Sequence, residues 1–339
     1  MTRPQFLVVS ALPHARSSES VQRMMLIMIA ALIPAFGCSI VLHGMRAVLA
    51  VLAGAVAAGA TDWLHASLRD RRVAAIDGSS CLTGTLLALS LPPPLPFWVA
   101  GIGAVFAVVV VKIVAGGLGR NFLNPALAGR AFLVFAVPAV FAVTTPQGNA
   151  ASALAHHPLV TLLLGYQAGW LGTSTAALLL GAIALWWLRT IDFSLPLAFI
   201  GSAFFLFWIS NGPFEMFHAA GLLAASGRMI AGGVLLVAIF MAPDPVTSPA
   251  AKRARILFGI VCGALTVLFE TFGTTDEGAM HAVLLMNLTV PFMDRYFRRR
   301  VFGGGPGPAV RTPEITVDAA GSDMAVSGES PEAAVEERE

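Results

Sequence analysis

Long apolar runs recur along this chain from residue 24 to residue 294, and they constrain the fold more than any other feature. The runs of near-membrane length are 24–42, 47–62, 97–114, 125–143, 171–188, 195–210, 229–241, 256–271 and 279–292. Hydrophobic residues make up 57% of the 339 residues and charged residues only 12%. A soluble globule leaves about a quarter of its chain surface exposed, so it could not hide this much apolar area. The sequence therefore predicts an all-α polytopic membrane protein and excludes a soluble enzyme, a disordered chain and a disulfide scaffold.

One apolar run is short. It covers residues 82–91 and stops at three consecutive prolines, 92–94, which suits a half-helix better than a straight span. If this run counts as a crossing, nearly all basic residues that flank the runs fall on one side of the membrane. These residues lie within 3–23, 69–72, 112–130, 189, 252–255 and 295–300. Only Arg46 and Arg228 then lie on the other side, so the positive-inside rule predicts about ten spans with both termini cytoplasmic.

Ten spans divide into two halves, 24–143 and 159–294, and an odd number per half makes the second half inverted. Such inverted five-helix repeats carry their sites on broken helices near the repeat interface. Each half has a segment rich in helix breakers, 116–126 in the first and 243–249 in the second.

The domain prediction has three parts. Residues 1–23 form a cytoplasmic N-terminal segment, and residues 24–302 form the transmembrane domain. Residues 303–339 start with a glycine- and proline-rich stretch and contain no long apolar run. We expect this last part to be a disordered cytoplasmic tail.

The first breaker segment contains Gly116, Gly117 and Gly119, which permit positive φ and a close approach of the backbone to a ligand. Pro125 then suits the first turn of the next helix. One interpretation is a backbone-lined site at a helix start, able to hold an anionic or polar ligand. The alternative is a tight turn between two spans.

Four further residues are candidates. Asp77 or Ser79 would cap the short run, and a half-helix start at membrane depth is electropositive. Asp62 and Asp244 lie at or near span ends. They are candidates for an ion path if they lie inside the membrane, and ordinary interfacial residues if they lie among the headgroups.

Charge and cysteine content narrow the ligands and partners. The formal net charge is +2, which argues against nucleic acid as a partner and leaves membrane lipid. The three cysteines, Cys38, Cys81 and Cys262, form no C-x-x-C pair. We therefore expect no zinc site and no cysteine-ligated iron–sulfur cluster within the chain.

Several motifs together resemble one family. They are the stretch 83–93, which begins Thr83-Gly84-Thr85, the stretch 116–126 with Asn121 and Asn124, Asp244-Pro245-Val246-Thr247, and 287–291 followed by Asp294. Their order and spacing resemble the RnfD protein of the Rnf ion-translocating oxidoreductase complex, which is related to the NqrB protein of the sodium-pumping NADH:quinone oxidoreductase. The resemblance runs from about residue 13 to residue 301.

The resemblance implies a flavin. In this family a loop outside the membrane, after the fifth span, carries FMN esterified through its phosphate to a Thr in an Asp-x-x-Ser-(Gly/Gln)-Ala-Thr stretch. The counterpart here is 146–152, in which Ser152 stands at the acceptor position, Pro146 replaces the Asp and Asn149 replaces the Ser. A Ser hydroxyl can form the same ester, and covalent and non-covalent FMN both stay open. A second flavin is also allowed. Besides Ser152, the expected cofactor-binding residues are Thr83, Asn121, Asn124, Gly116, Gly117 and Gly119.

The function implied by the resemblance is that of a membrane flavoprotein in the bacterial inner membrane. It would belong to an Rnf-type complex that couples electron transfer to ion translocation, with the other subunits and a flavin transferase as partners. The alternative is a passive channel or secondary transporter, because inverted repeats with half-helices also suit pores. Composition and topology fit both functions, and only the family motifs favour the first.

Overall fold

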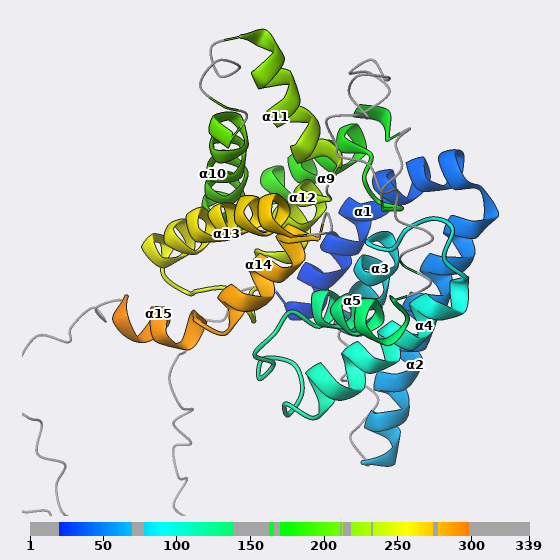
Figure 1. The fold of residues 1–339 in the computed structure, drawn as a ribbon. Coiled ribbons are helices and arrows are strands. Elements are labelled where there is room, and N and C mark those ends of the chain that lie inside the picture. The colour runs from blue at the N-terminus through cyan, green and yellow to red at the C-terminus, as the bar shows by residue number, and fades with distance from the viewer. Residues whose placement is uncertain are drawn as a thin grey trace, which may run out of the picture. The chain divides into compact units, whose positions relative to one another are not determined.

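The structure is a computed structural model that describes residues 20–69, 78–138, 141, 163–165, 170–210, 212, 218–231, 233–273 and 277–297. Within these ranges every regular element is a helix (Figure 1). Ser152, most of the segment 1–23 and the tail 303–339 lie outside the described residues.

Three described helices are long and apolar enough to cross a membrane: α1 (Val21–His43), α2 (Met45–Leu68) and α13 (Lys252–Phe272). A fourth candidate is a broken span. Its first part lies in α11 (Ala219–Ala231), and its second part comprises α12 (Val234–Leu236) and the π-helix η3 (Val237–Met241). The two parts meet at a bend of 62°, beside Gly233 with φ +66°. Helical membrane spans are thus confirmed, and the total of ten and the inverted repeat stay predictions.

The short apolar run forms α3 (Ser79–Leu89), a helix of 11 residues and about 16 Å. All its residues except Cys81 are buried, which fits a half-length helix enclosed by other helices. The expected side-chain cap is wrong for Ser79. The capping residue is Gly78, with φ +79° and no side-chain cap, and Ser79 is already helical. Asp77 lies outside the described residues.

The next run starts as α4 (Phe97–Phe106) and continues as the π-helix η2 (Ala107–Ile113). After the glycine-rich segment, α5 (Pro125–Ala136) begins as predicted, with Pro125 in its first turn. The Oδ1 atom of Asn124 caps it by accepting hydrogen bonds from two backbone N–H groups. This helix is shorter than the run 125–143, because residue 137 precedes a proline and is biased away from helical geometry.

The remaining described helices are α9 (Thr175–Trp187), α10 (Ser194–Ser210), α14 (Gly278–Asn287) and α15 (Val290–Tyr296). Helix α3 packs against α1, α2, α4 and α5, while α10 packs against α13, and α1 against α9 (Figure 1). The backbones of Gly54 on α2 and Gly84 on α3 touch, and a Cβ on either residue would collide with the carbonyl of the other. This contact brings the middle of α3 close to α2.

The outside of the molecule is apolar and several polar groups are inside it. Val41 is 80% exposed and Phe272 is 81% exposed. By contrast, Lys112, Asn124 and Arg130 are buried. This distribution suits a protein that is surrounded by lipid and has a polar functional interior.

Candidate functional site

A narrow cavity of about 50 Å³ lies where several of these helices meet. Its walls come from α1, α3, η2, the segment before α5, η3 and the segment after it. The apolar lining includes Met25, Met28, Leu82, Leu86 and Phe240. The polar lining comprises Ser79, Thr83, Lys112, Asn121, Asn124 and Asp244. An apolar slot with a few convergent polar groups is the usual form of a small-molecule site.

Asn124 ties three elements together at this cavity. Its side-chain N–H donates to the carbonyl of Met241 at 2.8 Å, at the end of η3. Its backbone N–H donates at 2.9 Å to the amide oxygen of Asn287, in the amide orientation that satisfies the neighbours of Asn287. The start of α5 is therefore fixed both to η3 and to the end of α14, which belong to the second half of the chain.

Asn121 and Asp244 are held by their own loops. The Asn121 amide N–H donates to the carbonyl of Leu123 at 3.2 Å, while its Oδ1 is buried and has no partner among the described residues. Asp244 accepts hydrogen bonds from the Val246 N–H at 3.3 Å and the Thr247 hydroxyl at 3.1 Å. Asn121 thus leaves a buried acceptor at the cavity, and Asp244 is a carboxylate fixed in its turn.

Lys112 is a site residue that the sequence analysis missed, since it was counted among the basic flanks. It is 6% exposed and lines the cavity from η2. Its ammonium pairs with Asp62 at 2.9 Å and donates to the hydroxyls of Ser79 and Ser80 at 2.8 Å each. The Ser80 hydroxyl also donates to Asp62 at 2.9 Å. The signal that could have revealed Lys112 is its position inside the run 97–114, where a charge needs an internal partner.

A second buried ion pair joins the two halves of the chain. Arg130 on α5 is 0% exposed and donates through Nε, at 2.8 Å, and through Nη2 to the carboxylate of Glu277 at the start of α14. The guanidinium carbon lies 3.9 Å from the centroid of the Trp170 ring. Arg130 was also counted as a cytoplasmic flank. It is not a surface charge in the structure, so it carries no weight in the predicted orientation.

The expected cofactor residues are only partly brought together. Thr83, Asn121, Asn124 and Asp244 line one cavity, and Asp62 reaches it through Lys112. Gly116, Gly117 and Gly119 have the positive φ that the sequence suggested, of 109°, 99° and 90°, but they do not line the cavity. Ser152 lies outside the described residues. Among the described residues no group of three His, Cys, Asp or Glu side chains is placed to hold a metal.

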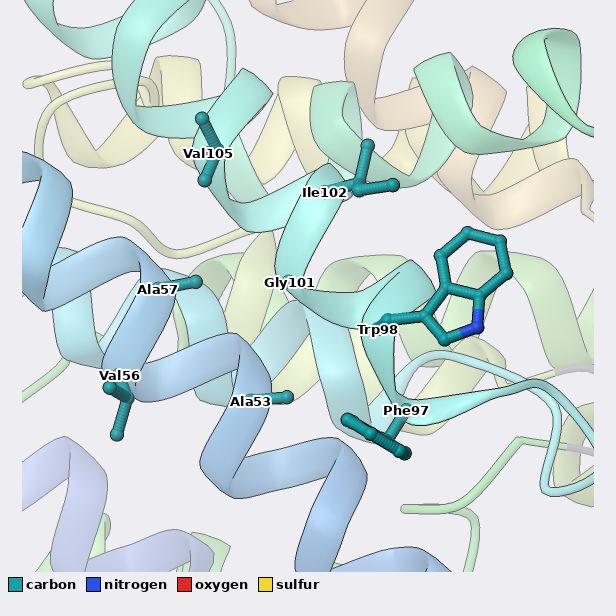
Figure 2. Close-up of a pocket in the computed structure, with 8 residues that line it drawn as sticks. All are labelled: Ala53, Val56, Ala57, Phe97, Trp98, Gly101, Ile102 and Val105. Carbon is teal, nitrogen blue, oxygen red and sulfur yellow. The ribbon is translucent and has the colours of Figure 1, made fainter.

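A larger hollow, of about 500 Å³, lies elsewhere on the molecule. It is a groove between α2 and α4, and Figure 2 shows its eight lining residues. All are apolar or glycine: Ala53, Val56, Ala57, Phe97, Trp98, Gly101, Ile102 and Val105. Because the Trp98 indole N–H is the only polar side-chain group in this lining, the groove has the character of a lipid-facing surface and is not where chemistry would occur.

The sequence pattern of the NQR2, RnfD, RnfE family matches residues 8–303, a range that contains all the cavity residues. The chain belongs to this family. Three relatives, each named as the D subunit of an oxidoreductase complex, cover most of its length. That of the proton-translocating ferredoxin:NAD(+) oxidoreductase complex of Clostridium ljungdahlii is 32% identical over 89% of this chain and 97% of its own length. That of the Na(+)-translocating ferredoxin:NAD(+) oxidoreductase complex of Acetobacterium woodii is 32% identical over 88% and 95%.

The third relative is the D subunit of the ion-translocating oxidoreductase complex of Stutzerimonas stutzeri, 34% identical over 84% of this chain and 93% of its own length. The relatives thus include one named for protons and one named for sodium, at the same 32% identity. The transported ion has to be argued from the residues of this chain.

Proposed function

We propose that this chain is the RnfD-type subunit of an ion-translocating oxidoreductase complex, of the kind that its relatives are named for with ferredoxin and NAD(+). Its role is to carry electrons on bound flavin and to provide part of the ion path. The observation that carries the proposal is the cavity. Family motifs from both halves of the chain, at Thr83, Asn121, Asn124 and Asp244, meet there.

The proposal includes a topology. Ten spans form two inverted halves, both termini are cytoplasmic, and the membrane is the bacterial inner membrane. The half-length of α3 and the broken span at Gly233 support it, since such elements are typical of inverted-repeat transporters. The other subunits of the complex are the partners, and the tail 303–339 is a disordered cytoplasmic extension.

FMN is proposed on Ser152, joined through its phosphate to the hydroxyl. A flavin transferase would make this bond, and the basis is the family pattern around residues 146–152. Pro146 and Asn149 depart from that pattern, so the attachment is the part of the proposal that the first experiment addresses.

A second flavin is proposed in the cavity, and its residues fit such a ring. Leu82, Leu86 and Phe240 offer apolar walls, and the buried Oδ1 of Asn121 offers an acceptor for a ring N–H. A cavity of about 50 Å³ is smaller in volume than a three-ring heterocycle, so the side chains that line it must move apart when the ring binds. The methionines of α1, Met25 and Met28, are the side chains best suited to do so, because Met is unbranched and repacks readily.

The flavin, when bound, supplies one- and two-electron chemistry, and the chain supplies binding, orientation and electrostatics. Asn121 orients the ring edge through its buried acceptor. Asn124 holds the start of α5 in place, and the apolar walls keep water away from the ring.

The experiment is a flavin count on the purified complex, by absorbance near 450 nm before and after acid precipitation. The amount of flavin released by acid measures non-covalent binding in the cavity. The amount of flavin that stays on this chain measures covalent attachment. Ser152→Ala should abolish the retained flavin and leave the released flavin, while Ser152→Thr should keep both. Asn121→Ala should lower the affinity for released flavin about tenfold, or ~1.4 kcal/mol. Ser226→Ala, an exposed control on α11, should change neither.

Each arm can fail separately. Retained flavin that survives Ser152→Ala would overturn the attachment site. Released flavin that is insensitive to Asn121→Ala would overturn the cavity assignment. A complex with no flavin on this chain at all would favour the passive channel or transporter.

A further inference from the structure

Lys112 contacts both the cavity and Asp62. It lines the cavity, and its ammonium also reaches Asp62 at 2.9 Å, away from the cavity lining. The ammonium also donates to the hydroxyls of Ser79 and Ser80, both at 2.8 Å. A small rotation of the flexible lysine stem would carry the ammonium from Asp62 toward the cavity, while Ser79, which also lines the cavity, could stay bonded.

Asp62 is less enclosed than its partner. Its side chain is 19% exposed, compared with 7% for Lys112. The carboxylate accepts from the Ser80 hydroxyl at 2.9 Å, so a carboxylate and a hydroxyl oxygen lie side by side there. Oxygens of this kind suit H⁺ or a hard monovalent cation. A cation can therefore reach Asp62 from the surface of the protein more easily than it can reach Lys112.

Among the described residues beside the cavity, Asp62 faces more positive charge than its own carboxylate offsets. Lys112 carries one positive charge, and the N-terminus of α3, which begins at Ser79, adds a partial positive charge. Of the described residues that line the cavity, the only other charged one is Asp244, whose carboxylate is bonded within its own turn. A negative charge that arises in the cavity would therefore be drawn to Lys112.

We propose that Lys112 is a charge-coupling residue that is shared between Asp62 and the cavity, and that Asp62 is the carboxylate that takes up the transported cation. One electron from a one-electron donor adds one negative charge to the cavity ligand. Lys112 moves its pairing to that charge, and Asp62 binds one monovalent cation, H⁺ or Na⁺, so that the total charge is unchanged. No covalent bond in the protein forms or breaks. This inference rests on the proposed flavin in the cavity.

Linkage gives a sharp test, because coupling between two sites is reciprocal. If reduction favours cation binding at Asp62, then the cation must favour reduction. In the wild-type complex the midpoint potential of the acid-releasable flavin should rise with added Na⁺ at fixed pH, or with falling pH at fixed Na⁺. The series that shows the rise identifies the cation. Asp62→Asn should remove that dependence.

The lysine variants test the other half. Lys112→Met should make reduction at least tenfold less favourable, about 59 mV for a one-electron couple. Lys112→Arg keeps the charge and should restore most of the potential. The control is Arg255→Met, which removes a cation from the more exposed pair with Asp192 and should leave the potential unchanged. An Asp62→Asn complex that keeps its cation dependence, or a Lys112→Met complex with wild-type potential, would overturn the proposal.

A second measurement needs no flavin. It therefore distinguishes failure of this inference about Asp62 from failure of the proposed flavin site. In Lys112→Met, Asp62 has lost its internal counter-charge and should bind the cation permanently. Thermal unfolding of this complex should then shift upward with Na⁺ compared with choline, or with lower pH. In the double variant Lys112→Met/Asp62→Asn neither member of this pair is charged, and it should show no shift. An identical shift in both variants would exclude Asp62 as the cation site, whether or not flavin is found.

Discussion

Two buried ion pairs among the described residues differ in burial, in geometry and in surroundings. Arg130 and Glu277 are 0% and 5% exposed and are joined through two parallel hydrogen bonds, with Trp170 against the guanidinium. Lys112 and Asp62 are 7% and 19% exposed and are joined through one bond, with serine hydroxyls around them. A planar guanidinium in a bidentate pair is geometrically fixed, whereas an ammonium on a flexible stem can exchange partners. The first pair is therefore a permanent joint between α5 and α14, and the second is a movable one beside the cavity.

Breaking the fixed pair should give the largest effect on stability. We expect Arg130→Met or Glu277→Gln to destabilise the protein by about 3–5 kcal/mol, because each leaves a buried charge without its partner. The measurement is thermal unfolding of the purified complex together with the yield of assembled complex. Arg130→Lys should recover little, since an ammonium replaces neither the bidentate bond nor the contact with Trp170. A variant Arg130→Lys with wild-type stability would show that the pair is not a fixed joint.

Breaking the movable pair should cost less. We expect Lys112→Met to destabilise the protein by about 1–3 kcal/mol, since Asp62 is exposed enough to be partly hydrated and keeps its bond from Ser80. Asp62→Asn in the Lys112→Met background should return part of that loss, because the uncompensated charge is then gone. Thermal unfolding of the two single variants and the double variant gives the coupling free energy. If Lys112→Met lost as much stability as Arg130→Met, the pair of Lys112 with Asp62 would be as fixed as that of Arg130 with Glu277, and the predicted difference would be wrong.

Motifs with local signatures were predictable from the sequence. The short run before three prolines became α3, and Asn124-Pro125 became a capped helix start, because capping and proline geometry depend only on neighbouring residues. Thr83, Asn121, Asn124 and Asp244 were singled out as motif residues, and they meet at one cavity.

Features that depend on distant partners were not predictable. Arg130 and Glu277 are 147 positions apart, and Lys112 and Asp62 are 50 apart, so no local pattern reports their pairing. A basic residue near the end of an apolar run looks like a membrane flank in sequence, and both cations were assigned that way. The change from α4 to the π-helix η2 was missed for a similar reason, since helix packing decides it and the composition of the run stays the same.

Breaking the described pair between Asp192 and Arg255 should have the smallest effect on stability. It is the partly exposed pair against which the two buried pairs are compared. It is joined at 3.1 Å, with side chains 34% and 27% exposed, in the connection before α10 and the first turns of α13. Partial burial alone would raise the pKa of Asp192. Hydrogen bonds from Ser194 and Arg255 and the Arg255 charge outweigh burial and hold that pKa below its usual value of 3.8.

A carboxyl whose pKa is lower in the folded than in the unfolded state stabilises the fold above its unfolded pKa, and the stabilisation is lost as the pH falls through the folded pKa. We therefore expect Arg255→Met to cost about 0.2–1 kcal/mol at pH 7 and at low salt, and less at high salt, because the pair is partly exposed and screened. The difference from wild type should persist down to about pH 4 and shrink below it as Asp192 becomes protonated. Thermal unfolding between pH 7 and pH 3 at two ionic strengths measures this. A loss that is independent of both salt and pH would mean that Arg255 acts by packing or through its 2.8 Å bond to the Pro249 carbonyl, and that its charge contributes little.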